Sequence, residues 1–287
     1  MTQPTTPDTG PADSQEKADA AAQAIAAALD RHERGVLLFS GGKESVVLAD
    51  LAEPVKDRIT LLWVNPGAPF PHMVDFVRGY GERFNLVELR SNLHERFVTR
   101  GLPSMIVPME NHESVIKARL HDGDRNRVRI SDWAACCSEL RNKPADDYVK
   151  ENAVSLIIHG QRHQENFLAA SLAPDTLAPL WNWTTDDVMA YINARRLRLP
   201  MQYPEILGDG SPTGGSMDCS FCTASVTPTR IQWVREHYPD IYQQLRPMLA
   251  AVYGAVAFEL DQLRPGLAEA DICPDQLAPH DHKETPK

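Results

Sequence analysis

A short apolar run near the N-terminus leads into a glycine-rich loop and then into a helix. Residues 36–39 are predicted to form a buried strand, and residues 45–51 a helix. The loop between them consists of Ser40, Gly41, Gly42, Lys43, Glu44 and Ser45. Glycines let backbone N–H groups approach an anion, and the N-terminus of a helix adds a partial positive charge. The segment therefore predicts a phosphate-binding loop, although a Gly-Gly turn without a ligand would fit the same residues.

Strands and helices alternate along most of the chain. Further strands are predicted at residues 59–64, 86–89 and 154–159, and further helices at residues 18–34, 71–84, 138–150 and 184–194. This alternation predicts an α/β fold with a doubly wound parallel sheet. Ligands of such sheets bind at the carboxyl ends of the strands. Asn65, which follows the second strand, is therefore expected to line the same crevice as the glycine-rich loop.

The two ends of the chain differ in composition from the middle. Residues 1–17 and 274–287 are rich in proline and polar residues and are predicted to be disordered. Residues 18–227 are predicted to form the α/β domain, and residues 228–273 a C-terminal helical extension. The chain shows neither a run apolar enough for a membrane span nor a secretory signal, so a cytoplasmic location is expected.

The net charge of −10 argues against broad, non-specific binding of nucleic acid, because such binding needs a basic surface. It leaves room for a local basic patch. Residues 121–129 carry three arginines and would suit a phosphate-bearing substrate or nucleic acid, or else form an ordinary charged loop.

Four of the five cysteines fall into two pairs that are separated by 81 residues: Cys136 with Cys137, and Cys219 with Cys222. In a reducing compartment, clustered cysteines indicate metal ligands before disulfides. Four thiolates suit an iron–sulfur cluster or zinc, and adjacent cysteines favour the bulkier cluster. Reduced cysteines in the core are the remaining interpretation. Cys273 stands alone and is interpreted as an incidental surface thiol.

Over roughly residues 35–225, the chain resembles the phosphoadenosine phosphosulfate (PAPS) reductase family. The resemblance rests on the segments SGGKES, WAACCSELRNKPADDYV, IIHGQRHQEN, LAPLWNWTTDDVMAYI and CSFC, which follow the family's order. It implies a Rossmann-like fold of the adenine nucleotide α-hydrolase type. The loop resembles the PP-loop S-G-G-x-D-S of ATP pyrophosphatases, with Glu44 in place of the usual Asp. The cysteine pattern resembles that of the 4Fe-4S adenylyl-sulfate (APS) reductases, which implies a cluster near the nucleotide.

The resemblance also implies roles for single residues. Gly160 and Arg162 belong to the family's Gly-x-Arg-x-x-Glu segment and are expected to bind the nucleotide. Arg162 would bind phosphate bidentately, or else form a salt bridge with Glu165. Lys43 and Arg162 are the candidate catalytic residues, and the whole of residues 40–45 is expected to contact the nucleotide.

Two departures from the family pattern shape the expected function. The Glu-Cys-Gly-x-His motif that supplies the nucleophilic cysteine of sulfonucleotide reductases is absent, and only Cys273 is left for that role. The Gly-Gly-Lys form of the loop is also closer to the ATP-cleaving branch of the superfamily.

The expected function is therefore sulfur transfer in which ATP, with Mg²⁺, adenylates an acceptor and releases pyrophosphate. A sulfur donor protein and a nucleic-acid acceptor are possible partners. Reduction of APS or PAPS to sulfite with thioredoxin is one alternative. A nucleotide- or redox-sensing module, or an accessory subunit, is the other.

Overall fold

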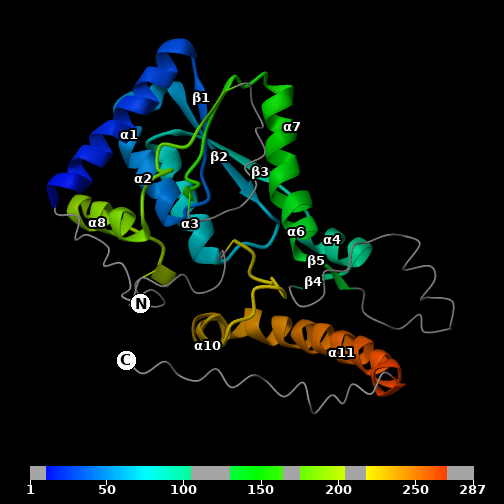
Figure 1. Ribbon diagram of the computed structural model, residues 1–287. Helices are drawn as coiled ribbons and strands as arrows, with labels where there is room; N and C mark the ends of the chain where they lie inside the picture. Colours follow the sequence, from blue (N-terminus) through cyan, green and yellow to red (C-terminus); the bar gives the residue numbers. More distant parts are fainter. Residues whose placement is uncertain (1–10, 105–129, 164–174, 204–217, 270–287) are drawn as a thin grey trace.

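Five parallel strands form the central sheet of the computed structural model, which describes residues 11–104, 130–163, 175–203 and 218–269 (Figure 1). The strands are β1 (Gly35–Leu38), β2 (Ile59–Asn65), β3 (Asn85–Arg90), β6 (Leu156–Ile158) and β7 (Asp175–Leu177). Their order is β3-β2-β1-β6-β7, and every neighbouring pair is parallel. The chain winds outward from β1 in both directions, so the predicted Rossmann-like, doubly wound fold is confirmed.

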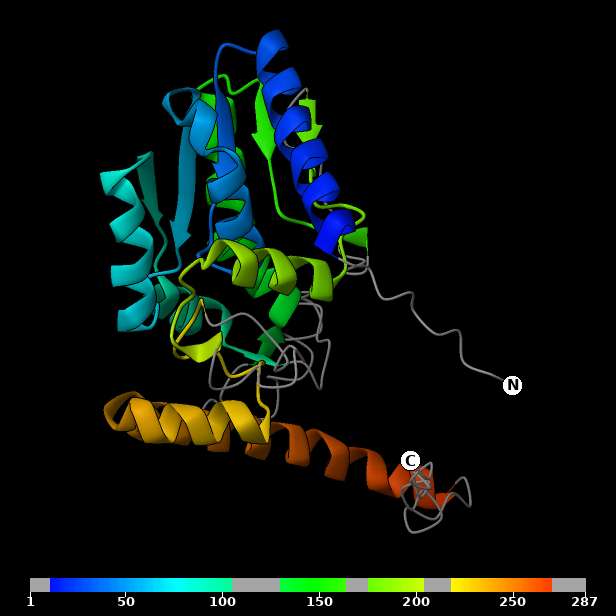
Figure 2. The same ribbon diagram turned by 90° about the vertical axis from the view of Figure 1, so that its left-hand side faces the viewer.

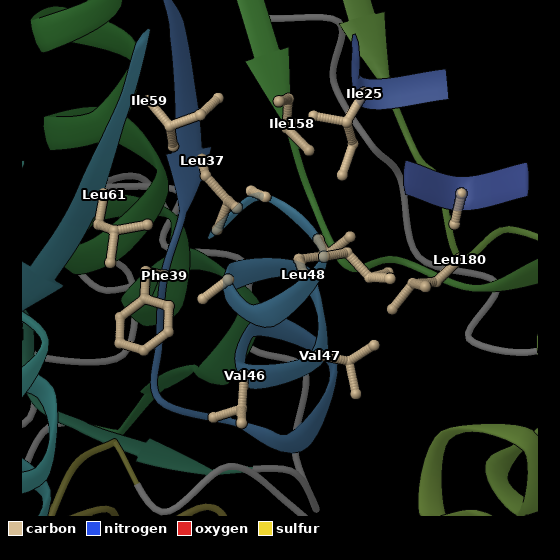
Figure 3. Packing of buried hydrophobic residues seen from close by; sticks show 14 of the residues in the cluster. Ile25, Leu37, Phe39, Val46, Val47, Leu48, Ile59, Leu61, Ile158 and Leu180 are labelled. Atoms are coloured by element: carbon tan, nitrogen blue, oxygen red, sulfur yellow. The ribbon is translucent and has the colours of Figure 1, made fainter. Parts of the chain in front are cut away.

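Helices cover both faces of this sheet, and alternate residues of β1 enter two different cores. Leu37 is fully buried on the face covered by α1 (Pro11–Arg31), α2 (Lys43–Leu51) and α8 (Thr185–Arg195), where it packs with Leu61 and Leu48 (Figure 3). Val36 faces α7 (Lys143–Glu151) and packs with Leu62. Burial on both sides explains why the strands are almost continuously apolar.

Helix α1 begins earlier than the sequence predicts, because residues 11–17 belong to it and were expected to be disordered. Lys17 forms a 2.9 Å ion pair with Asp187, whose carboxylate also completes the capping box of α8 with Thr184. Ala18 and Ala21, on the next turns of α1, are buried in the core. These contacts hold the N-terminal part of α1 against the domain, and the helix begins before residue 18, the start that composition indicated.

The structure is helical over the predicted residues 138–150, but the first turn of this stretch is π-helical rather than α-helical. The structure has α6 (Trp133–Cys137), a π-helical turn (Ser138–Asn142) and then α7. Pro144 lies in the first turn of α7 and has no N–H with which to continue an α-helical hydrogen-bond pattern. The carbonyl of Leu140 accepts a 2.7 Å hydrogen bond from the Ser91 hydroxyl instead.

The remaining elements lie around the edges of the sheet. They are the 3₁₀ turns Glu53–Arg58 and Tyr80–Glu82, α3 (Pro71–Gly79), α4 (Leu93–Arg100), β4 (Leu102–Ser104), β5 (Ile130–Asp132), α10 (Pro228–His237) and α11 (Pro239–Glu269). The turn at Tyr80 replaces the end of the helix predicted over residues 71–84. Strands β4 and β5 pair as a second, small parallel sheet, which the sequence analysis did not anticipate.

The C-terminal helices form a separate layer beyond the carboxyl ends of the central strands (Figures 1 and 2). Helix α10 begins at Pro228, where the helical extension was predicted to begin, and Thr227 caps it. Helix α11 packs Val252 and Val256 against Leu102 of β4 and Ile130 of β5. Within the described ranges, no helix combines the length and the apolar content that crossing a membrane requires.

Replacing Leu37 with alanine should lower the free energy of unfolding by about 2–5 kcal/mol, because a fully buried side chain at the centre of the sheet would leave a cavity. Urea denaturation followed by circular dichroism measures the change. Val98→Ala is the matched control: Val98 is 68% exposed, and the change should cost less than about 0.5 kcal/mol. Equal effects of the two substitutions would contradict the assignment of the core.

Candidate functional site

The glycine-rich loop lies at the carboxyl end of β1, next to the point where the strand order reverses between β1 and β6. Its hydrogen bonds are mostly internal. The N–H of Gly42 donates to Ser40 Oγ over 3.2 Å, and Ser45 Oγ donates to the carbonyl of Gly42 over 2.8 Å. Helix α2 begins at Lys43, and its N-cap Gly42 offers the helix no capping side chain. The N–H groups at the N-terminus of α2 therefore depend on acceptors from other segments or from a ligand.

Two glycines make the shape of this loop possible. Gly41 has a φ of +76°, and a Cβ there would lie 2.9 Å from Val77 Cγ2 of α3. Gly160 follows β6, and a Cβ there would lie 2.8 Å from Glu44 Cβ. The segment after β6 thus packs directly on the first turn of α2, as expected if both segments form one site.

Lys43 and Arg162 converge on the carboxylate of Glu44. Glu44 Oε1 lies 2.8 Å from Lys43 Nζ and 3.1 Å from Arg162 Nη2. Arg162 is only 5% exposed and also donates to Thr185 Oγ1 over 3.0 Å. The two candidate catalytic residues therefore lie together at the loop, and both cations share one carboxylate. The alternative partner of Arg162, Glu165, lies outside the described residues.

The side-chain amide of Asn65, at the end of β2, forms hydrogen bonds within the protein through both its nitrogen and its oxygen. Its Nδ2 donates to Glu88 Oε1 over 2.8 Å, and its Oδ1 accepts from the N–H of Gly67 over 2.9 Å. These bonds shape the turn after β2. Contact between Asn65 and a nucleotide stays a prediction.

The two cysteine pairs come together although they are far apart in the chain. Cys136 and Cys137 lie in α6, and Cys136 packs in a cluster with Leu93, Leu140 and Phe221. Phe221 lies between Cys219 and Cys222 in the sequence, so this contact joins the two pairs.

Further bonds fix the C-x-x-C segment in place. The Ser220 N–H and hydroxyl each donate to the Ala68 carbonyl over 2.9 Å, and the Ser225 N–H donates to Cys222 Sγ over 3.4 Å.

Burial and nearby arginines set the charge state of these thiols. Burial raises the pKa of Cys136 to about 12, and Arg96 acts in the opposite direction. Burial likewise raises the pKa of Cys137 and of Cys219, and Arg141 opposes it. Without a metal, the thiols of Cys136, Cys137 and Cys219 therefore hold their protons at neutral pH, and metal binding would have to release those protons.

The arginines around the cysteines are themselves tied in place. Arg96 Nε lies 2.7 Å from Glu139, and Arg141 Nη1 lies 2.9 Å from Asp218. Arg230 is fully buried and donates to the carbonyl of Cys219 over 2.8 Å. Within the described part of the chain, no three His, Cys, Asp or Glu side chains are placed to hold one metal ion. The assignment of the four cysteines as metal ligands stays a prediction.

A groove of about 650 Å³ lies between α3 and residues 196–201. None of the residues predicted to form the site lines it. The groove is therefore a feature separate from the loop and the cysteines.

Tyr203 contacts the loop and was not anticipated from the sequence. Its hydroxyl accepts a 3.1 Å hydrogen bond from the N–H of Lys43, a residue 160 positions away. Arg96 and Arg230, beside the cysteines, were missed as well. Sequence spacing carries no signal for such contacts, because each depends on how distant segments fold together. Cys273 and residues 121–129 lie outside the described residues.

A parallel sheet with a glycine-rich loop at its switch point, faced by a second loop from β6, defines a Rossmann-like α/β protein. The model of the phosphoadenosine phosphosulfate reductase domain matches residues 34–220, which is more than half of the chain. The chain belongs to this family.

Comparison with individual proteins gives more distant matches. An uncharacterized protein of Methanocaldococcus jannaschii is 24% identical over 219 residues, which cover 72% of this chain and 45% of that protein. Subunit 2 of sulfate adenylyltransferase from Mycobacterium tuberculosis is 25% identical over 187 residues, which cover 60% of this chain and 58% of that protein. This chain thus spans about half the length of these relatives.

Among solved structures, PAPS reductase from Candida auris, in a phosphate complex, aligns with a TM-score of 0.44 and 17% identity. The alignment covers 71% of this chain and 95% of that one.

Replacing Gly160 with alanine should weaken the binding of pyrophosphate by about fivefold to a hundredfold. The added methyl group would displace Glu44 and the start of α2, at a cost of about 1–3 kcal/mol. Isothermal titration calorimetry measures the affinity. Gly79→Ala is the matched control, because a Cβ there meets no atom within 4 Å, and it should leave the affinity unchanged. Unchanged affinity in the Gly160 variant would show that the β6 segment does not shape the loop.

Proposed function

We propose that this chain is a PP-loop enzyme of sulfur metabolism that binds ATP or an adenylyl sulfonucleotide at residues 40–45. In this proposal it transfers the adenylyl group of ATP to an acceptor and releases pyrophosphate. The observation that carries the proposal is the convergence of Lys43 and Arg162 at the N-terminus of α2. Two cations, a helix dipole and a glycine loop at one point form a site for a polyphosphate.

The proposed reaction is nucleotidyl transfer. An acceptor oxygen attacks the α-phosphorus of ATP, and a new oxygen–phosphorus bond forms. The bond between the α-phosphorus and the bridging oxygen breaks, and pyrophosphate leaves with the electron pair. The amides of the loop, Lys43 and Arg162 would hold the β- and γ-phosphates and stabilise this developing charge. Sulfur would then displace AMP from the adenylated acceptor.

Glu44 has a defined part in this proposal. In the ligand-free arrangement it neutralises Lys43 and Arg162 together. Incoming phosphates would compete for both cations and leave the carboxylate free to face the nucleotide. Glu44 is then the residue of the loop that offers a carboxylate oxygen to Mg²⁺, and Mg²⁺ when bound would screen the phosphate charges.

The match to sulfate adenylyltransferase subunit 2 supports adenylyl transfer rather than reduction. The cysteines support it too. A reductase needs a nucleophilic cysteine that is free of metal, and Cys136, Cys137, Cys219 and Cys222 are the proposed cluster ligands. Reduction of APS or PAPS with thioredoxin would therefore depend on Cys273.

We further propose that Cys136, Cys137, Cys219 and Cys222 hold a 4Fe-4S cluster. Four thiols from two segments joined through Phe221 have the donor chemistry of such a cluster. Each cysteine of a 4Fe-4S cluster binds a different iron, so the four sulfurs do not have to surround one point. Arg96, Arg141 and Arg230 would offset the negative charge of four thiolates. The cluster when bound would supply iron for handling sulfur.

Lys43→Met should weaken ATP binding by about tenfold to a hundredfold, because a charge-assisted hydrogen bond to phosphate is worth about 1.5–3 kcal/mol. Calorimetry measures binding, and a coupled assay detects pyrophosphate in the presence of sulfate, transfer RNA or DNA as acceptor. Lys56→Met is the control, since Lys56 pairs with Glu53 in a surface turn. If no acceptor yields pyrophosphate and APS yields sulfite instead, adenylyl transfer is wrong.

Anaerobically purified protein should contain about four irons and four sulfides per chain and should absorb broadly near 400 nm. Cys136→Ser and Cys219→Ser should each lower the iron content, because each removes one proposed ligand. Cys273→Ser is the matched control and should keep both the iron and the spectrum. Zinc, or no metal at all, in the wild-type protein would exclude the cluster.

A further inference from the structure

The hydroxyl of Tyr203 occupies the N-terminus of α2, where an anion would be expected. It accepts a 3.1 Å hydrogen bond from the N–H of Lys43, the first residue of the helix. A Cβ placed on Gly42 would lie 3.4 Å from the same hydroxyl, so the tyrosine lies directly over the loop. A neutral hydroxyl thus satisfies a donor that a phosphate oxygen would bind more strongly, because charge-assisted hydrogen bonds are about twice as strong as neutral ones.

A partly buried set of polar contacts holds the segment that carries Tyr203. Gln202, beside it, is buried, and its Oε1 lies 2.7 Å from Nε2 of His72 in α3. Nδ1 of His72 lies 2.7 Å from the hydroxyl of Tyr238. Because the Gln202 oxygen can only accept, Nε2 of His72 carries a proton. The Tyr238 hydroxyl also lies 3.7 Å from Met201 Sδ, so it contacts both His72 and Met201. The His72 and Tyr238 rings also stack, with centroids 5.7 Å apart.

Tyr238 lies between α10 and α11, beyond the residues that match the family domain. It packs in an aromatic cluster with Phe70 and Trp233. The C-terminal helices therefore reach the glycine-rich loop through His72, Gln202 and Tyr203. This connection links a segment outside the family domain to the first amide of α2.

We propose that Tyr203 is a positioning residue that lowers the affinity of the loop for phosphate by competing for the N–H of Lys43. The contacts of Gln202, His72 and Tyr238 keep its hydroxyl in place. A phosphate must displace the hydroxyl before it can bind the N–H of Lys43. The measured dissociation constant therefore equals that of a loop without the hydroxyl, divided by the fraction of molecules in which the hydroxyl has moved away. The inference rests on the proposed function, because it requires the loop to bind phosphate.

Tyr203→Phe tests the competition, because it removes the hydroxyl and keeps the ring. Titration calorimetry with inorganic pyrophosphate, and separately with ATP, should give a dissociation constant about threefold to tenfold lower than that of the wild type, the range expected for one hydrogen bond. A purely structural role would weaken binding instead. Tyr191→Phe is the matched control: it removes a buried hydroxyl that donates to Asp50 over 2.7 Å, away from the loop, and should leave the affinity unchanged.

Tyr238→Phe tests the connection to the C-terminal helices. It removes the hydrogen bond to His72 without touching the loop, and it should strengthen pyrophosphate binding by a smaller factor than Tyr203→Phe. Wild-type affinity in this variant would overturn the role of the helices.

The outcomes separate the two proposals. If the wild type binds pyrophosphate and Tyr203→Phe binds it equally or more weakly, the competition is wrong and the proposed function stands. If neither protein binds pyrophosphate or ATP, the proposed function fails and this inference fails with it. Circular dichroism of each variant verifies that it is folded, and the Tyr238 variant gives an independent reading if Tyr203→Phe is unstable.

Discussion

The parallel pairing of β1 with β2 on one side and β6 on the other is the constraint on which the site depends. Because Leu37 pairs with both Leu61 and Ile158, the ends of β1 and β6 lie side by side. This register brings Gly160 into contact with Glu44 and carries Arg162 to the same carboxylate. A shift of one residue would turn the buried side chains to the opposite face and separate the loop from its second cation.

Charge is balanced separately at the two centres of the molecule. At the loop, one carboxylate serves two cations, so the site carries a net positive charge that an anion can use. At the cysteines, Arg96 and Arg141 have carboxylate partners, and burial raises the pKa of Cys136, Cys137 and Cys219. The glycine-rich loop needs no change of protonation to bind phosphate, whereas the cysteines would have to lose protons to bind a metal.

Local patterns in the chain predicted much of this arrangement. The loop and the cysteine pairs could be found because each is a short motif with recognisable chemistry, whereas Arg162 was found through the family resemblance. Strands β1, β2, β3 and β6 followed from apolar runs that alternate with helices; β7, with the sequence DTL, has no such run and was not predicted. The π-helical turn before Pro144 was not predicted either: Pro144 has no N–H to bond to Leu140, and the Ser91 hydroxyl that bonds to that carbonyl comes from a distant segment. Tyr203 and Arg230 were missed because their targets, Lys43 and Cys219, are met only after distant segments fold together.

The part of the chain that supports the loop and the cysteines extends into the C-terminal helices. The match to the family domain stops at residue 220, between Cys219 and Cys222. Beyond that boundary, Arg230 of α10 donates a hydrogen bond to the carbonyl of Cys219. Tyr238 contacts His72, which in turn holds the segment that carries Tyr203. A chain shortened to the homologous region would keep every recognisable motif except Cys222 and still lack the scaffold of both centres. The structural unit of this protein is therefore longer than the unit that sequence similarity delimits.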